Sequence, residues 1–206
     1  MNKCYTYYQE IDAINNCPRR KSTQKELLDL CKESWKRSGW ELIVLDHSVA
    51  EKHEFFGEYS QIINELPTVN PSMYDYSCFI RWLAMVQTGG GLMIDYDVIN
   101  NGVYHLDRDE TQLTVYQGHV PCVVYGTPEQ YLEVCRGFCA IKDEFILHDG
   151  RPHTSDMIML ESGKIKFKKL RTVVDYPNNG GIVHCSQAHC QKNGKTKLEA
   201  MKELLA

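Results

Sequence analysis

The hydrophobic positions of this chain fall into short continuous runs separated by stretches with helical spacing, an order typical of an α/β fold. Residues 4–8 and 40–45 are rich in strand-forming side chains, and each run is predicted to be a strand. A helix is predicted between them from apolar residues on one face: Leu27, Leu30, Cys31 and Trp35. Strand, helix and strand in this order predict a βαβ unit with two parallel strands.

The pattern continues this alternation to the end of the chain. Residues 47–66 are expected to be partly helical, and Pro67 and Pro71 end that stretch. The next helix is predicted from the apolar face Phe79, Trp82, Leu83 and Val86. Later strands are predicted at 113–116, 120–125 and 171–176, with helices starting near 127, 156 and 196. The expected fold is one α/β domain over residues 1–206, with a mixed, mainly parallel central sheet flanked by helices.

Composition narrows the range of partners. The chain has 23 basic and 27 acidic residues and a net charge of −4, so nucleic-acid binding through a basic face is not expected. This balance is compatible with a local cationic pocket for a pyrophosphate. No apolar run approaches the length of a membrane span, so none is expected in this chain.

The number and spacing of the cysteines indicate the redox state of the cellular compartment in which the protein is expected. Nine are present at scattered spacings, and no signal-peptide pattern precedes them. Reduced thiols and a cytoplasmic location are therefore expected, which for a viral protein would be the cytoplasm of its host. The sequence is also compatible with one module of a longer protein.

The strongest candidate for chemistry is the stretch of residues 89–98, in which three glycines and a short apolar run precede Asp95 and Asp97. Residues i and i+2 of a strand point the same way, so both carboxylates are expected to face one point where the strand ends. Two hard oxygen ligands there suit Mg²⁺ or Mn²⁺ together with a substrate phosphate. The alternative is a strand that ends in an ordinary polar turn.

Residues 74–98 resemble the core of DXD-containing, GT-A-type glycosyltransferases, among which small viral and bacterial glycan-building enzymes are most similar. The resemblance is carried by Arg81-Trp82-Leu83, then Gly90-Gly91, then Asp95-Tyr96-Asp97-Val98. Cys78 stands where relatives often have an aspartate, and Gly89 is an additional glycine. The resemblance implies a GT-A-like fold, with a nucleotide-binding half near 1–100 and an acceptor-side half near 101–206.

It also implies an activity and a set of site residues. The expected reaction moves a sugar from a nucleotide diphosphate-sugar, preferably a UDP-sugar, to a hydroxyl group of a glycan acceptor. The ion, Mn²⁺ or Mg²⁺, is expected to be bound by Asp95, Asp97 and a late histidine, His184. The residues expected to contact the nucleotide are Tyr5, Thr6, Tyr7, Arg81, Asp95, Tyr96 and Lys195. Core packing remains the alternative for the tyrosines, a solvated side chain for Arg81, and a structural histidine for His184.

A second polar stretch, residues 148–156, offers the acid–base candidates. In the families that this chain resembles, an acidic residue on a comparable loop meets the acceptor hydroxyl, and here Asp156 or Asp149 is expected to do so. Asp156 has a good alternative role as an acid in the first turn of a helix.

Two other functions remain open. The first is a protein that binds or hydrolyses a nucleotide-sugar without transfer. The second is a zinc-binding interaction module that uses His184, Cys185, His189 and Cys190. Their spacing is too tight for a usual four-ligand structural site, which pairs its ligands across a longer loop.

Overall fold

The computed structural model, which describes residues 2–11 and 20–206, begins with the predicted βαβ unit. β1 (Asn2–Tyr7) and β2 (Trp40–Leu45) pair in parallel, with Asn2 opposite Trp40 and Tyr7 opposite Leu45. α1 (Arg20–Arg37) precedes β2 in the chain and packs above the sheet. The two strands therefore end at the same edge.

The central sheet has the order β2-β1-β3-β6-β5-β9. Its further strands are β3 (Gly91–Ile94), β5 (Thr114–Gln117), β6 (Val120–Gly126) and β9 (Lys168–Lys169). β1 pairs in parallel with β2 and β3, and β5 pairs in parallel with β9, whereas β6 is antiparallel to both of its neighbours. The prediction of an α/β fold with a mixed central sheet is thus confirmed.

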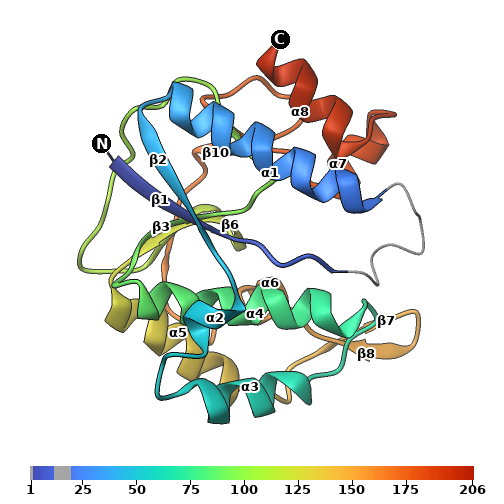
Figure 1. The fold of residues 1–206 in the computed structure, drawn as a ribbon. Coiled ribbons are helices and arrows are strands. Elements are labelled where there is room, and N and C mark those ends of the chain that lie inside the picture. The colour runs from blue at the N-terminus through green and yellow to red at the C-terminus, as the bar shows by residue number, and fades with distance from the viewer. Residues whose placement is uncertain (1, 12–19) are drawn as a thin grey trace.

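Helices cover both faces of this sheet (Figure 1). One layer holds α2 (His47–Ala50), α3 (Phe56–Asn64), α4 (Ser72–Gln87), α5 (Pro128–Ala140) and α6 (Asp156–Glu161). The other holds α1, α7 (Gln187–Lys192) and α8 (Lys197–Leu205). Each layer encloses its own apolar core, with Trp82 and Phe138 in the first and Trp35 and Met201 in the second.

A smaller sheet joins two distant parts of the chain beside the carboxyl end of β3. It has the order β10 (Val173–Asp175), β11 (Ile182–His184) and β4 (Val98–Asn100). β11 runs antiparallel to β4 and places His184 opposite Val98. Because β4 directly follows Asp97, this pairing brings His184 next to that aspartate.

Two glycines of the sequence motif have a steric purpose. Gly90 has φ +78°, and a Cβ there would lie 2.6 Å from the backbone oxygen of Gly126. Gly91, with φ +113°, packs against the ring of Tyr5. Larger side chains would separate the end of α4 from the sheet and displace β3.

The stretch at 148–156, expected to be a polar loop leading into a helix, is instead partly a β-hairpin. β7 (Ile146–His148) and β8 (Arg151–His153) pair antiparallel around Asp149 and Gly150, both with positive φ. A two-residue loop with this backbone is the favoured hairpin connection, and Asp-Gly is one of its preferred sequences. Ser155 then caps α6, with its side chain accepting from the amide of Ile158. None of the helices in the described residues is both long and apolar enough to span a bilayer.

Candidate functional site

The Asp-Tyr-Asp segment is a tight turn at the carboxyl end of β3. The amide of Asp95 still donates to the carbonyl of Cys122 at 2.8 Å, as a continuation of the sheet, and the amide of Val98 then donates back to the carbonyl of Asp95 at 3.1 Å. The two carboxylates therefore converge through a turn between β3 and β4, and not through the alternation of an extended strand as the sequence analysis assumed. The turn is anchored from β11, where the amide of Cys185 donates to the carbonyl of Asp97 at 2.9 Å.

Three candidate ligands meet at this turn. One ligand atom each from Asp95, Asp97 and His184 lies within 4.8 Å of the others. Nε2 of His184 is 3.6 Å from Oδ1 of Asp97. Asp97 and His184 are buried, at 6% and 8% exposure, whereas the Asp95 side chain is 27% exposed and forms the open side of the cluster.

Gln117 orients the histidine. Its Oε1 lies 2.8 Å from Nδ1 of His184 and also accepts from the thiol of Cys122 at 2.8 Å. An amide oxygen only accepts, so this network assigns the ring proton to Nδ1 and leaves the lone pair of Nε2 facing Asp97. A hydrogen bond of this kind to the non-ligating nitrogen is typical of metal-binding histidines.

Two cations from other elements neutralise the aspartates. Nη1 of Arg81, on α4, contacts Asp95, and its Nη2 donates to Oδ2 of Asp156 at 2.8 Å. Nζ of Lys197, at the start of α8, contacts Oδ2 of Asp97. Arg81 is only 8% exposed, so its charge is committed to these two carboxylates.

The two aspartates differ in electrostatic environment. Burial raises the pKa of Asp95, and the opposing effect of Arg81 is not enough to cancel it, since the neighbouring Asp97 also raises it. Burial acts in the same direction on Asp97, but Lys197 and His184 outweigh it and hold the pKa of Asp97 below its ordinary value. Two like charges in one buried site usually divide in this way. Asp97 is thus the more firmly ionised of the two candidate ligands.

The residues that the sequence predicts to contact the nucleotide do not all lie at the turn. Tyr7 is buried and its hydroxyl pairs with Gln9 at 3.0 Å, while Tyr5 lines a pocket beside Gly89–Gly91, at the opposite end of β3 from Asp95. Thr6 is fully buried, and its hydroxyl has no hydrogen-bond partner among the residues that the structure describes. Tyr96 packs edge-to-face on Tyr8, with ring centroids 5.7 Å apart. Tyr8, which directly follows β1, is therefore the tyrosine of this segment that contacts the turn, and it is not among the nucleotide contacts expected from the sequence.

The remaining predicted residues also fall in different places. Lys195 pairs with Glu203 at 2.9 Å and makes no described contact with the cluster, a position that Lys197 takes instead. Asp156 is buried and accepts from Arg81 and from the indole of Trp82, the latter at 3.0 Å. The Asp149 side chain is 83% exposed at the hairpin tip, and its one described ion pair is with His148 at 3.4 Å.

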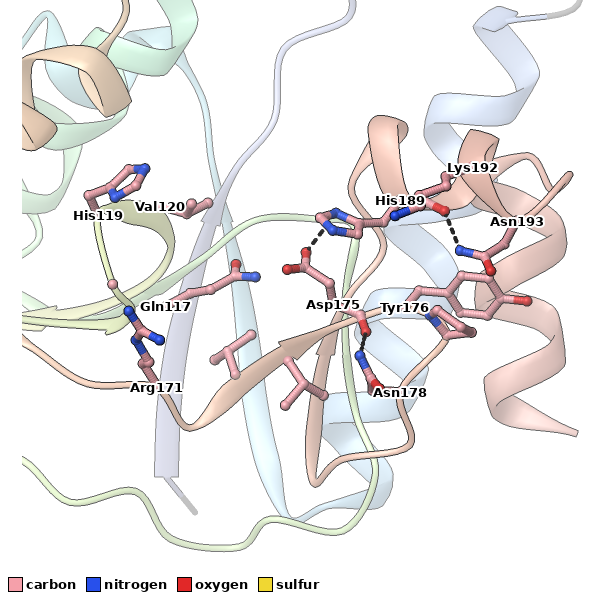
Figure 2. Close-up of a pocket in the computed structure, with 14 residues that line it drawn as sticks. Gln117, His119, Val120, Arg171, Asp175, Tyr176, Asn178, His189, Lys192 and Asn193 are labelled. Carbon is pink, nitrogen blue, oxygen red and sulfur yellow. Dashed lines mark hydrogen bonds and ion pairs between the residues drawn. The ribbon is translucent and has the colours of Figure 1, made fainter.

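A cavity of about 660 Å³ opens beside the cluster, and Figure 2 shows the residues that line it. Gln117 and Asp175 line it, and both face Nδ1 of His184, at 2.8 Å and 3.9 Å. Asp175 also pairs with His189 at 3.2 Å. No pattern in the chain marks Asp175, so the sequence does not predict its place at this cavity.

Cys185 and Cys190 are fully buried next to this region, and His189 points to Ser186 and Asp175. Within residues 2–11 and 20–206, the one group of three or more potential ligands is Asp95, Asp97 and His184. The described residues thus do not assemble the four zinc ligands that the alternative would need.

No protein-family model matches the sequence, and neither a curated protein nor a solved structure matches it significantly.

Proposed function

We propose that this protein is a metal-dependent glycosyltransferase that moves a sugar from a nucleotide diphosphate-sugar to a hydroxyl group of a glycan acceptor. The observation that carries the proposal is the convergence of Asp95, Asp97 and His184, from segments almost ninety residues apart, at the carboxyl end of β3. The ends of strands in α/β sheets are the usual place for such ligands. The resemblance of residues 74–98 to DXD-containing glycosyltransferases supplies the reaction class, and it favours uridine as the base.

The three side chains suit a divalent ion. Adjacent ligands of an octahedral ion lie about 3 Å apart and opposite ligands about 4.2 Å apart. The spread of up to 4.8 Å among the three ligand atoms is close to these separations, so small side-chain shifts suffice. Two carboxylates and one imidazole match Mn²⁺ well and Mg²⁺ less well, because Mg²⁺ prefers oxygen ligands. When bound, such an ion would neutralise a diphosphate leaving group.

The residues around the cluster have separable tasks. Arg81, on α4, contacts the carboxylate of Asp95, so this carboxylate keeps one orientation when a nucleotide binds. Lys197 is placed to pair with diphosphate oxygens, because its ammonium group already lies against Asp97 and its side chain is 22% exposed. Tyr8 and Tyr96 offer aromatic surface for the base.

For an inverting reaction a general base must accept the proton of the acceptor hydroxyl, and a carboxylate can serve as that base. Asp156 is engaged by Arg81 and Trp82 and buried at 4% exposure, so it serves better as a positioning residue for Arg81. Asp175 is 29% exposed, lines the cavity and lies next to His184, which makes it the better placed base.

Nucleotide binding tests this function directly. UDP should raise the melting temperature of the protein only when Mn²⁺ or Mg²⁺ is present, and GDP should do so less. The His184→Ala variant should need more Mn²⁺ and should lose part of the preference for Mn²⁺ over Mg²⁺. A transfer assay with labelled UDP-sugars, in which free sugar is quantified separately, distinguishes transfer from hydrolysis. If no nucleotide diphosphate binds with either ion, the proposal is wrong.

A further inference from the structure

We propose that the cavity beside the cluster binds a saccharide that carries an anionic group, a carboxylate or a phosphate, and that this saccharide is the acceptor. Its role as acceptor rests on the function proposed above, whereas its binding does not. Three features of the cavity carry the inference: its cations, its uncommitted amide oxygens and its position.

Basic side chains lie on both sides of the cavity. Arg171 and His119 are on the side of β5 and β6, and His189 and Lys192 are on the side of α7 (Figure 2). Neither Arg171 nor Lys192 has an acidic partner among the residues that the structure describes. Asp175 is the one acidic residue of the lining, so with its histidines neutral the lining has a formal net charge of +1 (two cations minus one carboxylate), in a chain of net charge −4. Arginine in particular matches a carboxylate or a phosphate through two parallel hydrogen bonds.

The acidic groups near the cavity lie against histidines and not against Arg171 or Lys192. Asp175 pairs with His189 at 3.2 Å and lies 3.9 Å from His184, and Glu161 lies 3.9 Å from His119. No acidic side chain described here faces Arg171 or Lys192 within ion-pair distance. The two cations are therefore available to a ligand.

Asparagine side chains in the cavity suit hydroxyl groups. The amide nitrogen of Asn178 donates to the carbonyl of Asp175 at 2.8 Å, and that of Asn193 donates to the carbonyl of His189 at 2.8 Å. These bonds fix both amides and leave their side-chain oxygens as acceptors with no described donor. Val120, Val173 and Val174 add apolar surface to the lining. A sugar ring, with hydroxyl groups at its edge and C–H groups on its faces, fits this lining.

The position of the cavity points to an acceptor and not to the donor. The cavity reaches the cluster through Gln117 and Asp175, which lie on the Nδ1 side of His184, whereas Asp97 lies on the Nε2 side. The donor diphosphate belongs with the ion on the Nε2 side. A saccharide in the cavity would thus approach from the opposite side of His184, next to the Asp175 carboxylate. Its volume, about 660 Å³, holds one or two sugar rings.

Direct binding of simple saccharides tests the site without any donor. Glucuronic acid, glucose 6-phosphate and neutral glucose would be titrated into ¹⁵N-labelled protein, with the amide signals of Val120, Val173 and Val174 as reporters. At least one of the two acidic sugars should bind 10-fold or more tightly than glucose, and the tighter of the two identifies carboxylate or phosphate as the anionic group. Arg171→Gln should weaken that binding at least 5-fold, and Arg171→Lys should restore part of it.

The matched control is Arg136→Gln, an exposed arginine on α5 in the opposite layer, which should leave saccharide binding unchanged. Equal binding of glucose, or an unaffected Arg171→Gln variant, would overturn the proposal. Inorganic phosphate that binds as tightly as glucose 6-phosphate would overturn the saccharide part of it. Binding of UDP with Mn²⁺, measured on the same proteins, keeps the two proposals apart: its absence from wild type contradicts the glycosyltransferase and not the cavity, and Arg171→Gln should leave it intact.

Discussion

The Asp95–Asp97 turn and the β7–β8 hairpin are both short polar connections that carry aspartates, but they differ in what holds those aspartates. Asp95 and Asp97 are held by Arg81 from α4 and Lys197 from α8. Asp149, at the hairpin tip, has only its neighbour His148 as a described partner and is 83% exposed. When side chains from distant elements contact a carboxylate, they fix its position and its charge, so it can bind an ion or a substrate. A carboxylate on an isolated tip has mainly a local, conformational role.

The largest effect should come from Asp97→Asn, which keeps the shape of the turn and removes the more firmly ionised ligand. Loss of a residue that only hydrogen-bonds to a metal ligand typically lowers metal affinity about 10–100-fold. Loss of the ligand Asp97 itself should lower Mn²⁺ affinity by at least this factor and should abolish transfer. Lys197 is partly exposed, so its ammonium group can turn to water and the fold should remain intact. Isothermal titration with Mn²⁺ and a transfer assay measure the two losses. Undiminished Mn²⁺-dependent turnover would exclude this turn as the site.

The second largest effect should be on stability, from Arg81→Met. This change leaves Asp156, at 4% exposure, with a buried charge and, among the described residues, only the indole of Trp82 as a side-chain donor. Removing one partner of a buried ion pair costs about 3–5 kcal/mol of unfolding free energy. Urea denaturation would measure it. The double variant Arg81→Met/Asp156→Asn should recover part of the loss, because it removes the unpaired charge, and no recovery would mean that Arg81 acts through packing alone.

The parts of this site that sequence could predict are those that local pattern dictates. The apolar run before Asp95 and the spacing of the two aspartates locate the end of β3, and the glycines at 90 and 91 accompany it. The connection to His184 came from family resemblance, because the pairing of β4 with β11 depends on tertiary folding. Nothing local marks Gln117 or Asp175, which reach the histidine from other strands.

Two residues of the site, Lys197 and Tyr8, could have been predicted from the sequence. Lys197 lies four residues before the buried Met201, so both share the inward face of α8, whereas Lys195 precedes its Thr196 cap. Tyr8 follows the last residue of β1, and the carboxyl end of the strand is where the turn lies. In both cases the register of an element decided which of several like residues faces the cluster.

A smaller effect, on UDP binding, should distinguish the role of Lys197 from that of Lys195. Lys197→Met should raise the UDP concentration needed in the presence of Mn²⁺ about 10-fold, because a charged hydrogen bond contributes about 1.5–3 kcal/mol. Lys195→Met removes a lysine of the same type whose partner is Glu203, and it should leave UDP binding unchanged. Titration of both variants with UDP at saturating Mn²⁺ makes the comparison. The reverse result would return the diphosphate contact to Lys195.

The smallest effect should come from Asp149→Asn, which tests whether the hairpin aspartate acts by charge or by conformation. Asp149 has φ +52° and Gly150 φ +75°, and asparagine before glycine favours this turn at least as well as aspartate does. The variant should keep its stability within about 0.5 kcal/mol and its transfer rate within about twofold. Gly150→Ala is the contrasting change, because it keeps the charge and forces a side chain into the left-handed region at a cost of about 1 kcal/mol. Urea denaturation and a transfer assay on both variants decide the matter. If Asp149→Asn loses transfer while UDP and Mn²⁺ still bind, Asp149 is the base, and the hairpin must close over the cluster during the reaction.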